Sequence, residues 1–489
     1  MCVSTFRMMR PSRTLSGIGL LLFTAAALLI HGYHFGAEDQ AIYVPAIKRF
    51  LDPSYPASVF FLATTSWTLF PQLVASCTRL MHFPLDVTLF IGHLASIFLL
   101  LLGSLRLSER LFSRPVAHWS SVAMLTGLLT LPVTGTGLFP IEPYFHPRDL
   151  AVALFMFALL ATLDRRPLAI VWIALAACVH IQITMYAAVH LLFQAPRPTR
   201  NRIGTVVPLM LLLIRAWAPA NDAWRQVLRT RDDFLIFGWS WYEWLGVFGP
   251  LLILQMFAHF ARRRDMADLA TVSGRLAMSG TVMVAAAILV NALPLLERCI
   301  PLQPMRSLLF IYLLLAVFAG GWLGQVVLQD RRWRWAALFL PLYAGMFYTQ
   351  RREFPASPHI EWPGRLPAND WVSAFDWVRF NTPRNALFAL DPMYLERPGN
   401  DFHGFRAFAD RRMLADYVKD RGIAAQFPEL ADQWQREVHA LQNWGTFGPR
   451  DYRGLRENLG VTWVIVEQPG RAGLSCPYAN HLVMVCSIE

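Results

Sequence analysis

The stretch from Ser307 to Leu328 reads SLLFIYLLLAVFAGGWLGQVVL and contains no charged side chain. A helix needs about 20 mostly apolar residues to cross the hydrocarbon core of a bilayer. This stretch is therefore typical of a transmembrane helix. It is one of eleven apolar segments before residue 350 that we predict as membrane spans: 15–31, 85–105, 116–134, 149–163, 168–181, 182–195, 203–218, 244–260, 276–293, 307–328 and 335–349.

The composition of the whole chain favours a membrane protein. Of its 489 residues, 55% are hydrophobic and only 16% are charged, whereas a soluble domain carries about 25% charged residues. The net charge of +11 could indicate nucleic-acid binding. However, the arginines form short clusters between apolar runs, as topology signals do, and no nucleic-acid-binding motif is present, so we expect no nucleic-acid partner.

The basic clusters predict the orientation of the chain. We take segment 67–82, which contains polar residues, as an interfacial helix rather than a span. Most basic residues then fall on one side of the membrane, which the positive-inside rule assigns to the cytoplasm together with the N-terminus. If 168–195 were instead one long tilted helix, everything after it would be reversed. The clusters are Arg7/Arg10/Arg13, Arg106/Arg110/Arg114, Arg165/Arg166, Arg197/Arg200/Arg202, Arg262/Arg263/Arg264 and Arg331/Arg332/Arg334.

The last part of the chain has the pattern of a water-soluble α/β domain. We therefore divide the chain into a membrane domain, 1–350, and a C-terminal extracytoplasmic domain, 351–489. Cys476 and Cys486 could form a disulfide if that end of the chain is outside the cytoplasm. The predicted elements are helices at 371–380 and 429–444 and strands at 387–390, 461–467 and 481–488.

An acidic pair, Glu38 and Asp39, follows the first predicted span closely. A carboxylate held there could accept a proton from a hydroxyl group or bind a divalent cation. Adjacent residues on a helix diverge by about 100°, so the two carboxylates are not expected to act on one atom. The alternative is a solvated loop or a charge at a helix N-terminus.

Three further positions could bind a ligand at the outer face. His146 and Arg148 precede a predicted span, and Arg148 could bind a lipid phosphate; alternatively they anchor the chain at the interface while Asp149 caps the helix. His180 lies between two short segments and could instead be a buried structural histidine. Arg306 could bind a phosphate or extend to lipid headgroups.

Taken together, these features resemble the GT-C class of membrane glycosyltransferases, in particular an uncharacterised bacterial branch. The resemblance rests on short motifs and on the layout of the chain, including its C-terminal outer domain. The motifs are Gly36-Ala-Glu-Asp-Gln-Ala-Ile-Tyr, Leu51-Asp-Pro, Pro147-Arg148, His180 between short helices, and Gln303-Pro-Met-Arg306.

The resemblance implies an enzyme of the bacterial inner membrane that moves a sugar from a polyprenyl-phosphate carrier to an extracytoplasmic acceptor, which would be an envelope glycan, a lipid or a protein. Asp39, with Glu38 beside it, would be the catalytic base or a ligand for Mg²⁺ or Mn²⁺. His146, Arg148, His180 and Arg306 would contact the carrier phosphate or the substrate.

One departure from the family pattern concerns the metal. Relatives often carry an acidic residue shortly after Leu-Asp-Pro, whereas this chain reads Ser54-Tyr-Pro-Ala-Ser-Val-Phe. Two other functions stay open, the second of them because of this missing acid. One is a transporter or flippase of lipid or polysaccharide, although the predicted spans contain almost no acidic residues. The other is an envelope assembly factor without catalytic activity.

Overall fold

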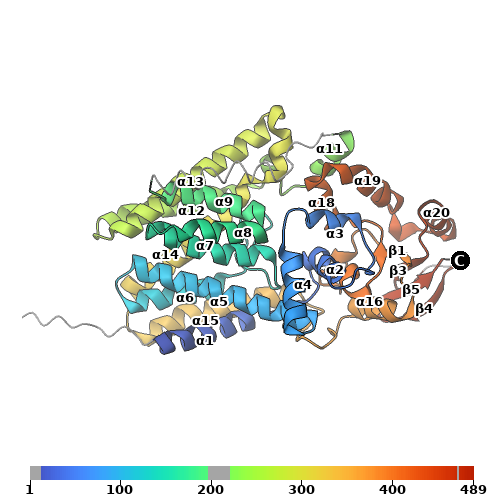
Figure 1. Cartoon of the computed structure of the whole chain (residues 1–489), viewed down its shortest axis with the longest axis horizontal. Helices are drawn as coiled ribbons and strands as arrows, with labels where there is room; N and C mark the ends of the chain where they lie inside the picture. Colours follow the sequence, from blue (N-terminus) through green and yellow to red (C-terminus); the bar gives the residue numbers. More distant parts are fainter. Residues whose placement is uncertain (1–12, 197–220, 471–472, 489) are drawn as a thin grey trace, which may run out of the picture.

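The computed structural model describes residues 13–196, 221–470 and 473–488. Figure 1 shows long helices running side by side in a bundle at one end and a small sheet with its own helices at the other. Three short helices lie between the two: α2 (Gln40–Leu51), α3 (Val59–Thr64) and α4 (Phe70–Met81). The predicted span 203–218 and the basic residues at 7, 10, 197, 200 and 202 lie outside the described residues.

The structure fits a membrane protein, but the prediction of eleven spans is wrong. Among the described residues, four helical segments are long and apolar enough to cross a membrane. Three further apolar helical segments have only 10–17 residues. The four are α5 (Leu85–Leu111), α12 (Trp241–Arg262), α13 (Ala267–Ala292) and the continuous stretch Pro294–Leu328, which contains α14 (Leu308–Leu323). The three are Ser16–His31 in α1 (Arg13–His31), α8 (Leu168–Val179) and α9 (Ile181–Gln194).

A break at His180 explains why two of the predicted spans are short. The backbone of His180 is extended (φ −154°, ψ 93°), which ends α8 and starts α9. With 12 residues, α8 is about 18 Å long at 1.5 Å per residue, well short of the hydrocarbon thickness of about 30 Å. The predicted segments 168–181 and 182–195 meet at this break, but neither helix is long enough to count as a span of its own.

The inner helices of the bundle are held by close packing. α7 (Pro147–Leu163) packs against α5, α8 and α9 and is buried on most of its surface, as expected for a helix that is apolar all round. α6 (Pro115–Leu128) packs against α14 and α15 (Arg332–Glu353). A Cβ atom at Gly320 would lie 2.6 Å from the Ser120 carbonyl oxygen, so only glycine permits this contact between α14 and α6.

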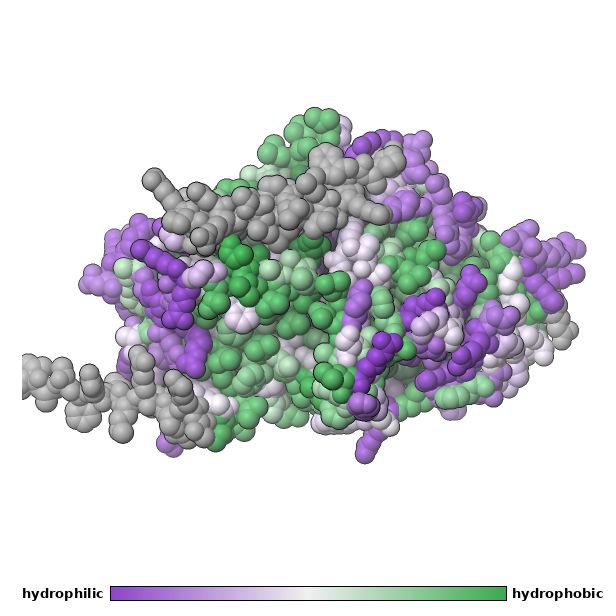
Figure 2. Space-filling view, in the orientation of Figure 1, coloured by the Kyte–Doolittle hydropathy of each residue, from purple (hydrophilic) through white to green (hydrophobic). Residues whose placement is uncertain are grey.

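The connections that carry arginine clusters meet at one end of the bundle. Arg110, at the end of α5, forms ion pairs with Asp164 after α7 and with Asp268 at the start of α13. Arg114 pairs with Asp330, between α14 and α15. Figure 2 shows an apolar surface between this hydrophilic end and the hydrophilic C-terminal end. On the face shown, two polar ends are separated by an apolar surface, here called the apolar belt, an arrangement that suits a bilayer.

The C-terminal part is built on a five-stranded mixed sheet with the order β2-β1-β3-β5-β4. β1 is parallel to β2 and β3, whereas β5 is antiparallel to β3 and β4. Cys476 and Cys486 form a disulfide between β4 and β5. The strands are β1 (Leu387–Ala389), β2 (Arg412–Met413), β3 (Trp463–Glu467), β4 (Ser475–Ala479) and β5 (Val483–Ser487), and the main helices are α16 (Asp370–Asn381), α18 (Asp420–Gln426), α19 (Ala431–Ala440) and α20 (Pro449–Leu459).

Segment 67–82, expected to be an interfacial helix, forms the two-sided helix α4. Phe70 and Val74 are buried against α2, whereas Leu73 and Leu80 are 46% and 81% exposed. In Figure 1, α4 lies between the bundle and the sheet and runs across the direction of the bundle helices. An exposed apolar face on a short transverse helix is typical of a helix lying in the membrane interface.

Candidate functional site

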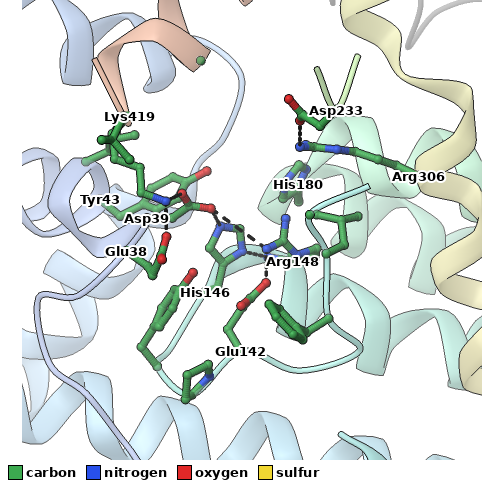
Figure 3. A pocket seen from close by; sticks show the side chains of 18 of the residues that line it. Glu38, Asp39, Tyr43, Glu142, His146, Arg148, His180, Asp233, Arg306 and Lys419 are labelled. Atoms are coloured by element: carbon green, nitrogen blue, oxygen red, sulfur yellow. Dashed lines mark hydrogen bonds and ion pairs between the residues drawn. The ribbon is translucent and has the colours of Figure 1, made fainter. Parts of the chain in front are cut away.

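A cavity of about 600 Å³ lies where the bundle, helices α2 and α3, and the C-terminal part meet. Its walls come from segments far apart in the chain, including residues 38–43, 130–148, 346–354 and 418–426. All six residues singled out from the sequence line this one cavity (Figure 3): Glu38, Asp39, His146, Arg148, His180 and Arg306.

The acidic loop before α2 is held in place by the C-terminal part. The Glu38 amide donates to the Phe402 carbonyl at 2.9 Å, and the Gly404 amide donates to the Gly36 carbonyl at 2.9 Å. Gly36 has φ +72°, and a Cβ atom there would lie 2.5 Å from the Phe408 ring. Position 36 therefore requires glycine, for its backbone conformation and for the close approach of the ring.

Asp39 is held between a cation and a histidine. Its Oδ1 atom lies 2.9 Å from Lys419 Nζ, and its Oδ2 atom lies 3.2 Å from His146 Nε2. Lys419 also forms an ion pair with Glu38, so the two carboxylates meet on one atom. The prediction from helix geometry was wrong because Glu38 precedes α2 and has φ +54°. Asp39 stands at the N-terminus of α2, but its side chain makes no capping bond. Asp39 is therefore a charge at a helix N-terminus, as one alternative predicted, and it also makes specific contacts at the cavity wall.

The electrostatics of the site keep Asp39 ionised. Burial alone would raise the pKa of its carboxyl group, but Lys419, His146 and Arg148 outweigh burial and hold that pKa well below its usual value. The side chain retains 30% exposure, and Asp39 lines the cavity. Asp39 is thus an anion that presents part of its carboxylate to any ligand in the cavity.

The tautomer of His146 follows from its contacts. Its Nδ1 atom accepts a hydrogen bond from the Arg148 amide at 2.9 Å, so in the neutral ring the proton is on Nε2 and is donated to Asp39. Burial and the neighbouring charge of Arg148 lower the pKa of His146 to about 4, which favours the neutral ring. Asp149 accepts from the His146 amide at 3.2 Å and completes a capping box at the start of α7.

Arg148 is already engaged by an acid that we did not single out from the sequence. Its guanidinium forms a buried ion pair with Glu142, and it lies 4.0 Å from Asp39 Oδ2. Burial raises the pKa of Glu142 to about 7 against the opposing effect of Arg148. Glu142 lies in the same Pro-rich loop as His146, but only the fold shows that its carboxylate reaches the cavity.

Another set of cavity residues is rich in arginine. Arg306 and Arg231 both pair with Asp233, at 3.4 Å and 2.8 Å. Arg421, from the C-terminal part, donates to the Thr230 carbonyl at 2.9 Å. The Nε atoms of these three arginines are buried and have no hydrogen-bond partner within the described chain. Two of these cations share one carboxylate and the third lies on the same cavity wall, so the arginines form an environment suited to an anionic ligand.

His180 joins the site at the break between α8 and α9. Its Nδ1 atom accepts weakly from the Ile183 amide at 3.5 Å, and its ring centre lies 6.0 Å from that of His146. His180 is only partly buried; its ring caps α9 and also lines the cavity, and its role toward a ligand stays a prediction. Gln182, the next polar residue, donates to the Pro301 carbonyl at 3.0 Å and ties this break to the segment before Arg306.

The acidic pair is poorly suited to a divalent cation. Its two carboxylates already share the ammonium group of Lys419, and the proton on His146 Nε2 excludes that nitrogen as a ligand in this tautomer. No group of three or more His, Cys, Asp or Glu side chains within the described ranges could hold a metal ion. The residues present do not fit the Mg²⁺ or Mn²⁺ ligand role that the family resemblance implied for Asp39.

No protein-family model and no curated protein matches this chain.

Proposed function

We propose that this protein is a membrane glycosyltransferase of the GT-C type, which transfers a sugar from a polyprenyl-phosphate carrier to an extracytoplasmic acceptor. The observation that carries the proposal is the composition of the cavity. It combines an ionised carboxylate, Asp39, with unpaired arginine donors and apolar side chains. A lipid-linked sugar phosphate presents the matching groups, namely hydroxyls, an anion and an alkyl chain.

The arginine-rich wall would hold the carrier phosphate. During transfer, the acceptor oxygen bonds to the anomeric carbon while the bond from that carbon to the phosphate oxygen breaks. The departing phosphate keeps the electron pair, and Arg306, Arg231 and Arg421 would stabilise its growing charge. Arg148 would contribute less than expected from the sequence, because Glu142 already neutralises it.

Asp39 would orient the acceptor hydroxyl group. A carboxylate whose pKa is held far below neutral is a weak base, so its contribution comes from accepting a hydrogen bond and from stabilising positive charge at the anomeric carbon. Glu142, with a pKa of about 7, is better matched to receive the proton at neutral pH.

The apolar lining would accommodate the first part of the polyprenyl chain. Trp67, Phe139, Ile181 and Met346 all border the cavity. They lie near the boundary between the apolar belt and the C-terminal part, where a carrier lipid would present its headgroup. We place this boundary at the outer face of a bacterial inner membrane. The arginine clusters at the opposite end of the bundle support that orientation, and so does the disulfide in the C-terminal part.

A silent binding protein is the second candidate, and one observation favours it. Both oxygens of Asp39 already contact protein groups. Such a carboxylate is less available to act on an acceptor hydroxyl group, as expected for a site that binds its ligand without reaction. A transporter has less support, because the acidic residues that line the cavity lie outside the four long spans.

Release of free polyprenyl phosphate distinguishes these candidates. Purified protein in nanodiscs would be incubated with a panel of polyprenyl-phosphate-linked hexoses and an envelope extract as acceptor. The transferase proposal expects polyprenyl phosphate to accumulate with the wild type and at least about 100-fold more slowly with Asp39→Asn. Binding of a donor without release by either protein would support the silent binder, and equal release by both would remove Asp39 from its role.

A further inference from the structure

Lys419 approaches the acidic pair from the C-terminal part of the chain. It is one of only two lysines in the sequence. Its Nζ atom contacts Glu38 and lies 2.9 Å from Asp39 Oδ1, and the side chain is only 14% exposed. Figure 3 shows the ammonium group directed at the two carboxylates on the side away from His146. A single positive charge therefore lies between two acids that stand at the cavity wall.

We infer that Lys419 is a built-in cation, which occupies the position that a divalent metal ion would take at Glu38 and Asp39. The inference deepens the proposed function, because it makes sugar transfer at this site independent of metal. It also makes the site dependent on the C-terminal part of the chain. Lys419 acts here as a positioning residue: it touches the carboxylates and holds them in place for the substrate.

A buried hydrogen-bond network holds the backbone around Lys419 in place. Asp416 accepts hydrogen bonds from the amides of Lys419, at 2.5 Å, and Asp420, at 3.2 Å. Asp420 in turn pairs with the buried guanidinium of Arg406 at 2.6 Å. The side chains of Arg406, Asp416 and Asp420 are each at most 4% exposed. A network of this kind fixes the backbone from which Lys419 extends, so the ammonium group does not depend on a mobile loop.

The charge balance agrees with this role. Arg148 is neutralised by Glu142, and His146 donates to Asp39 as a neutral ring. Without Lys419, the two carboxylates Glu38 and Asp39 would face the cavity with only the more distant Arg148 as compensation. With it, Glu38, Asp39 and Lys419 together carry one net negative charge, so these two carboxylates attract a divalent ion less strongly. Glu353, which also lines the cavity, lies outside this ion-paired group. Lys419 therefore adjusts the charge of the site as well as its shape.

Binding of Mn²⁺, followed by electron paramagnetic resonance, tests this inference without requiring any sugar transfer. The full-length protein in detergent is titrated with MnCl₂, and the signal of free aqueous Mn²⁺ is recorded. The wild type is expected to leave that signal undiminished. Lys419→Met, which keeps the length of the side chain and removes the charge, is expected to take up one Mn²⁺ per chain, and Lys419→Met/Asp39→Asn is expected to lose it again.

The other lysine provides the matched control. Lys48 also pairs with a carboxylate, that of Asp410 at 2.6 Å, but does not line the cavity, so Lys48→Met should bind no Mn²⁺. If the wild type takes up one Mn²⁺ and Asp39→Asn abolishes this uptake, the inference is overturned. Failure of folded Lys419→Met to take up Mn²⁺ would also overturn it.

If Lys419→Met cannot be recovered, Lys419→Gln, which keeps a polar side chain without the charge, replaces it, with the same expected uptake of one Mn²⁺ per chain. Because no donor or acceptor sugar enters the experiment, these outcomes are separate from the success or failure of the transferase proposal. If transfer is observed, it should be unaffected by EDTA in the wild type.

Discussion

The ammonium group of Lys419 lies 2.9 Å from the carboxylate of Asp39, although 380 positions separate the two residues in the chain. This contact joins the loop after the first helix to the C-terminal part. It is supported by two further contacts between the same regions, from Glu38 to Phe402 and from Gly404 to Gly36. The cavity wall that carries the acidic pair therefore cannot form from the helical bundle alone.

His146 controls the charge of Asp39, and its loss should move the pH profile of transfer. The Nε2–H group of His146 stabilises the ionised form of Asp39 and so lowers its pKa. In His146→Ala the pKa of Asp39 rises, and the acidic limb of the pH–rate profile should shift to higher pH. A hydrogen bond to a charged group contributes about 1.5 kcal/mol, which corresponds to a shift of about one pH unit. His439→Ala, an exposed histidine on α19, should leave the limb in place; a limb unchanged in His146→Ala would refute this control of Asp39.

A buried cluster of two histidines and an acid should make stability depend on pH. Glu361 Oε1 accepts from His34 at 3.0 Å and from His403 at 2.9 Å. The other ring nitrogen of His403 lies 2.7 Å from the Asn400 carbonyl, which can only accept, so both nitrogens of His403 carry protons. The cluster joins the segment before Glu38, the chain after α15 and the C-terminal part.

The sign of the pH dependence of stability follows, for the Glu361–His403 pair, from the pKa shifts of these two groups. The pKa of Glu361 falls from 4.5 to about 2, because its histidine contacts outweigh burial. Its contribution is present above pH 4.5 and is lost as the pH falls toward 2. The pKa of His403 is raised from 6.5, because Glu361 outweighs burial. Its contribution is complete below pH 6.5 and is lost as the pH rises through the folded-state pKa.

Thermal unfolding in detergent between pH 4 and 9 measures this effect. The contribution of the Glu361–His403 pair should be largest between pH 4.5 and 6.5. His34 opposes it as the pH falls below 6.5, because burial lowers the pKa of His34. Glu361→Gln leaves the His403 charge buried without its partner and should cost about 3–5 kcal/mol near pH 6, with a smaller loss at pH 9. Glu457→Gln, an exposed acid on α20, should change stability by less than about 0.5 kcal/mol. A loss in Glu361→Gln that is equal at every pH would contradict the assignment.

The disulfide between Cys476 and Cys486 should stabilise the C-terminal sheet. The two residues are separated by 10 positions, and closing a loop of this size stabilises the folded state by about 2–3 kcal/mol. Dithiothreitol should therefore lower the unfolding temperature of the wild type but not that of the Cys476→Ser/Cys486→Ser variant. Cys77→Ser, which changes an exposed free cysteine, should keep the response to dithiothreitol. A wild type insensitive to reduction would argue against the bond.

Labelling of introduced cysteines should show which polar end faces outward. Glu109 is exposed near the arginine clusters, and Arg365 is exposed near the C-terminal part. A membrane-impermeant maleimide applied to spheroplasts should label Arg365→Cys, in a background without the native free cysteines, and should label Glu109→Cys only after lysis. The reverse pattern would place the cavity at the cytoplasmic face, where an extracytoplasmic acceptor cannot reach it.

The sequence predicted the parts of the structure that depend on local pattern. The apolar run at 307–328 and the β run at 461–467 were identified because hydrophobic periodicity is a local property. The number of spans was wrong because it included short apolar helices, such as the two on either side of the break at His180, which pack against their neighbours but are too short to cross a membrane. Strand β4 was missed because its side chains alternate between exposed and partly buried without a strongly apolar face.

The six residues predicted for the site line the same cavity, but the contacts that define their chemistry could not be predicted. Lys419, Arg421 and Arg231 stand in segments without a recognisable motif, and only the fold brings them to the cavity. Glu142 was visible in a loop that had been singled out, yet its pairing with Arg148 requires the turn between them. Charge pairs between distant segments leave no signal in a single sequence.

Binding of undecaprenyl phosphate to the purified protein tests the central claim most directly, because it requires neither the right sugar nor the right acceptor. Native mass spectrometry would count the lipid bound to three proteins: the wild type, Arg231→Gln/Arg306→Gln and Arg436→Gln. Arg436 is an exposed arginine on α19 and serves as the control. We predict one bound lipid per wild-type chain and the same affinity in Arg436→Gln. In the double variant the affinity should be at least about tenfold weaker, because each lost contact between arginine and phosphate costs about 1.5 kcal/mol or more. No bound lipid, or equal binding by all three proteins, would contradict the assignment of this cavity to a polyprenyl-phosphate carrier.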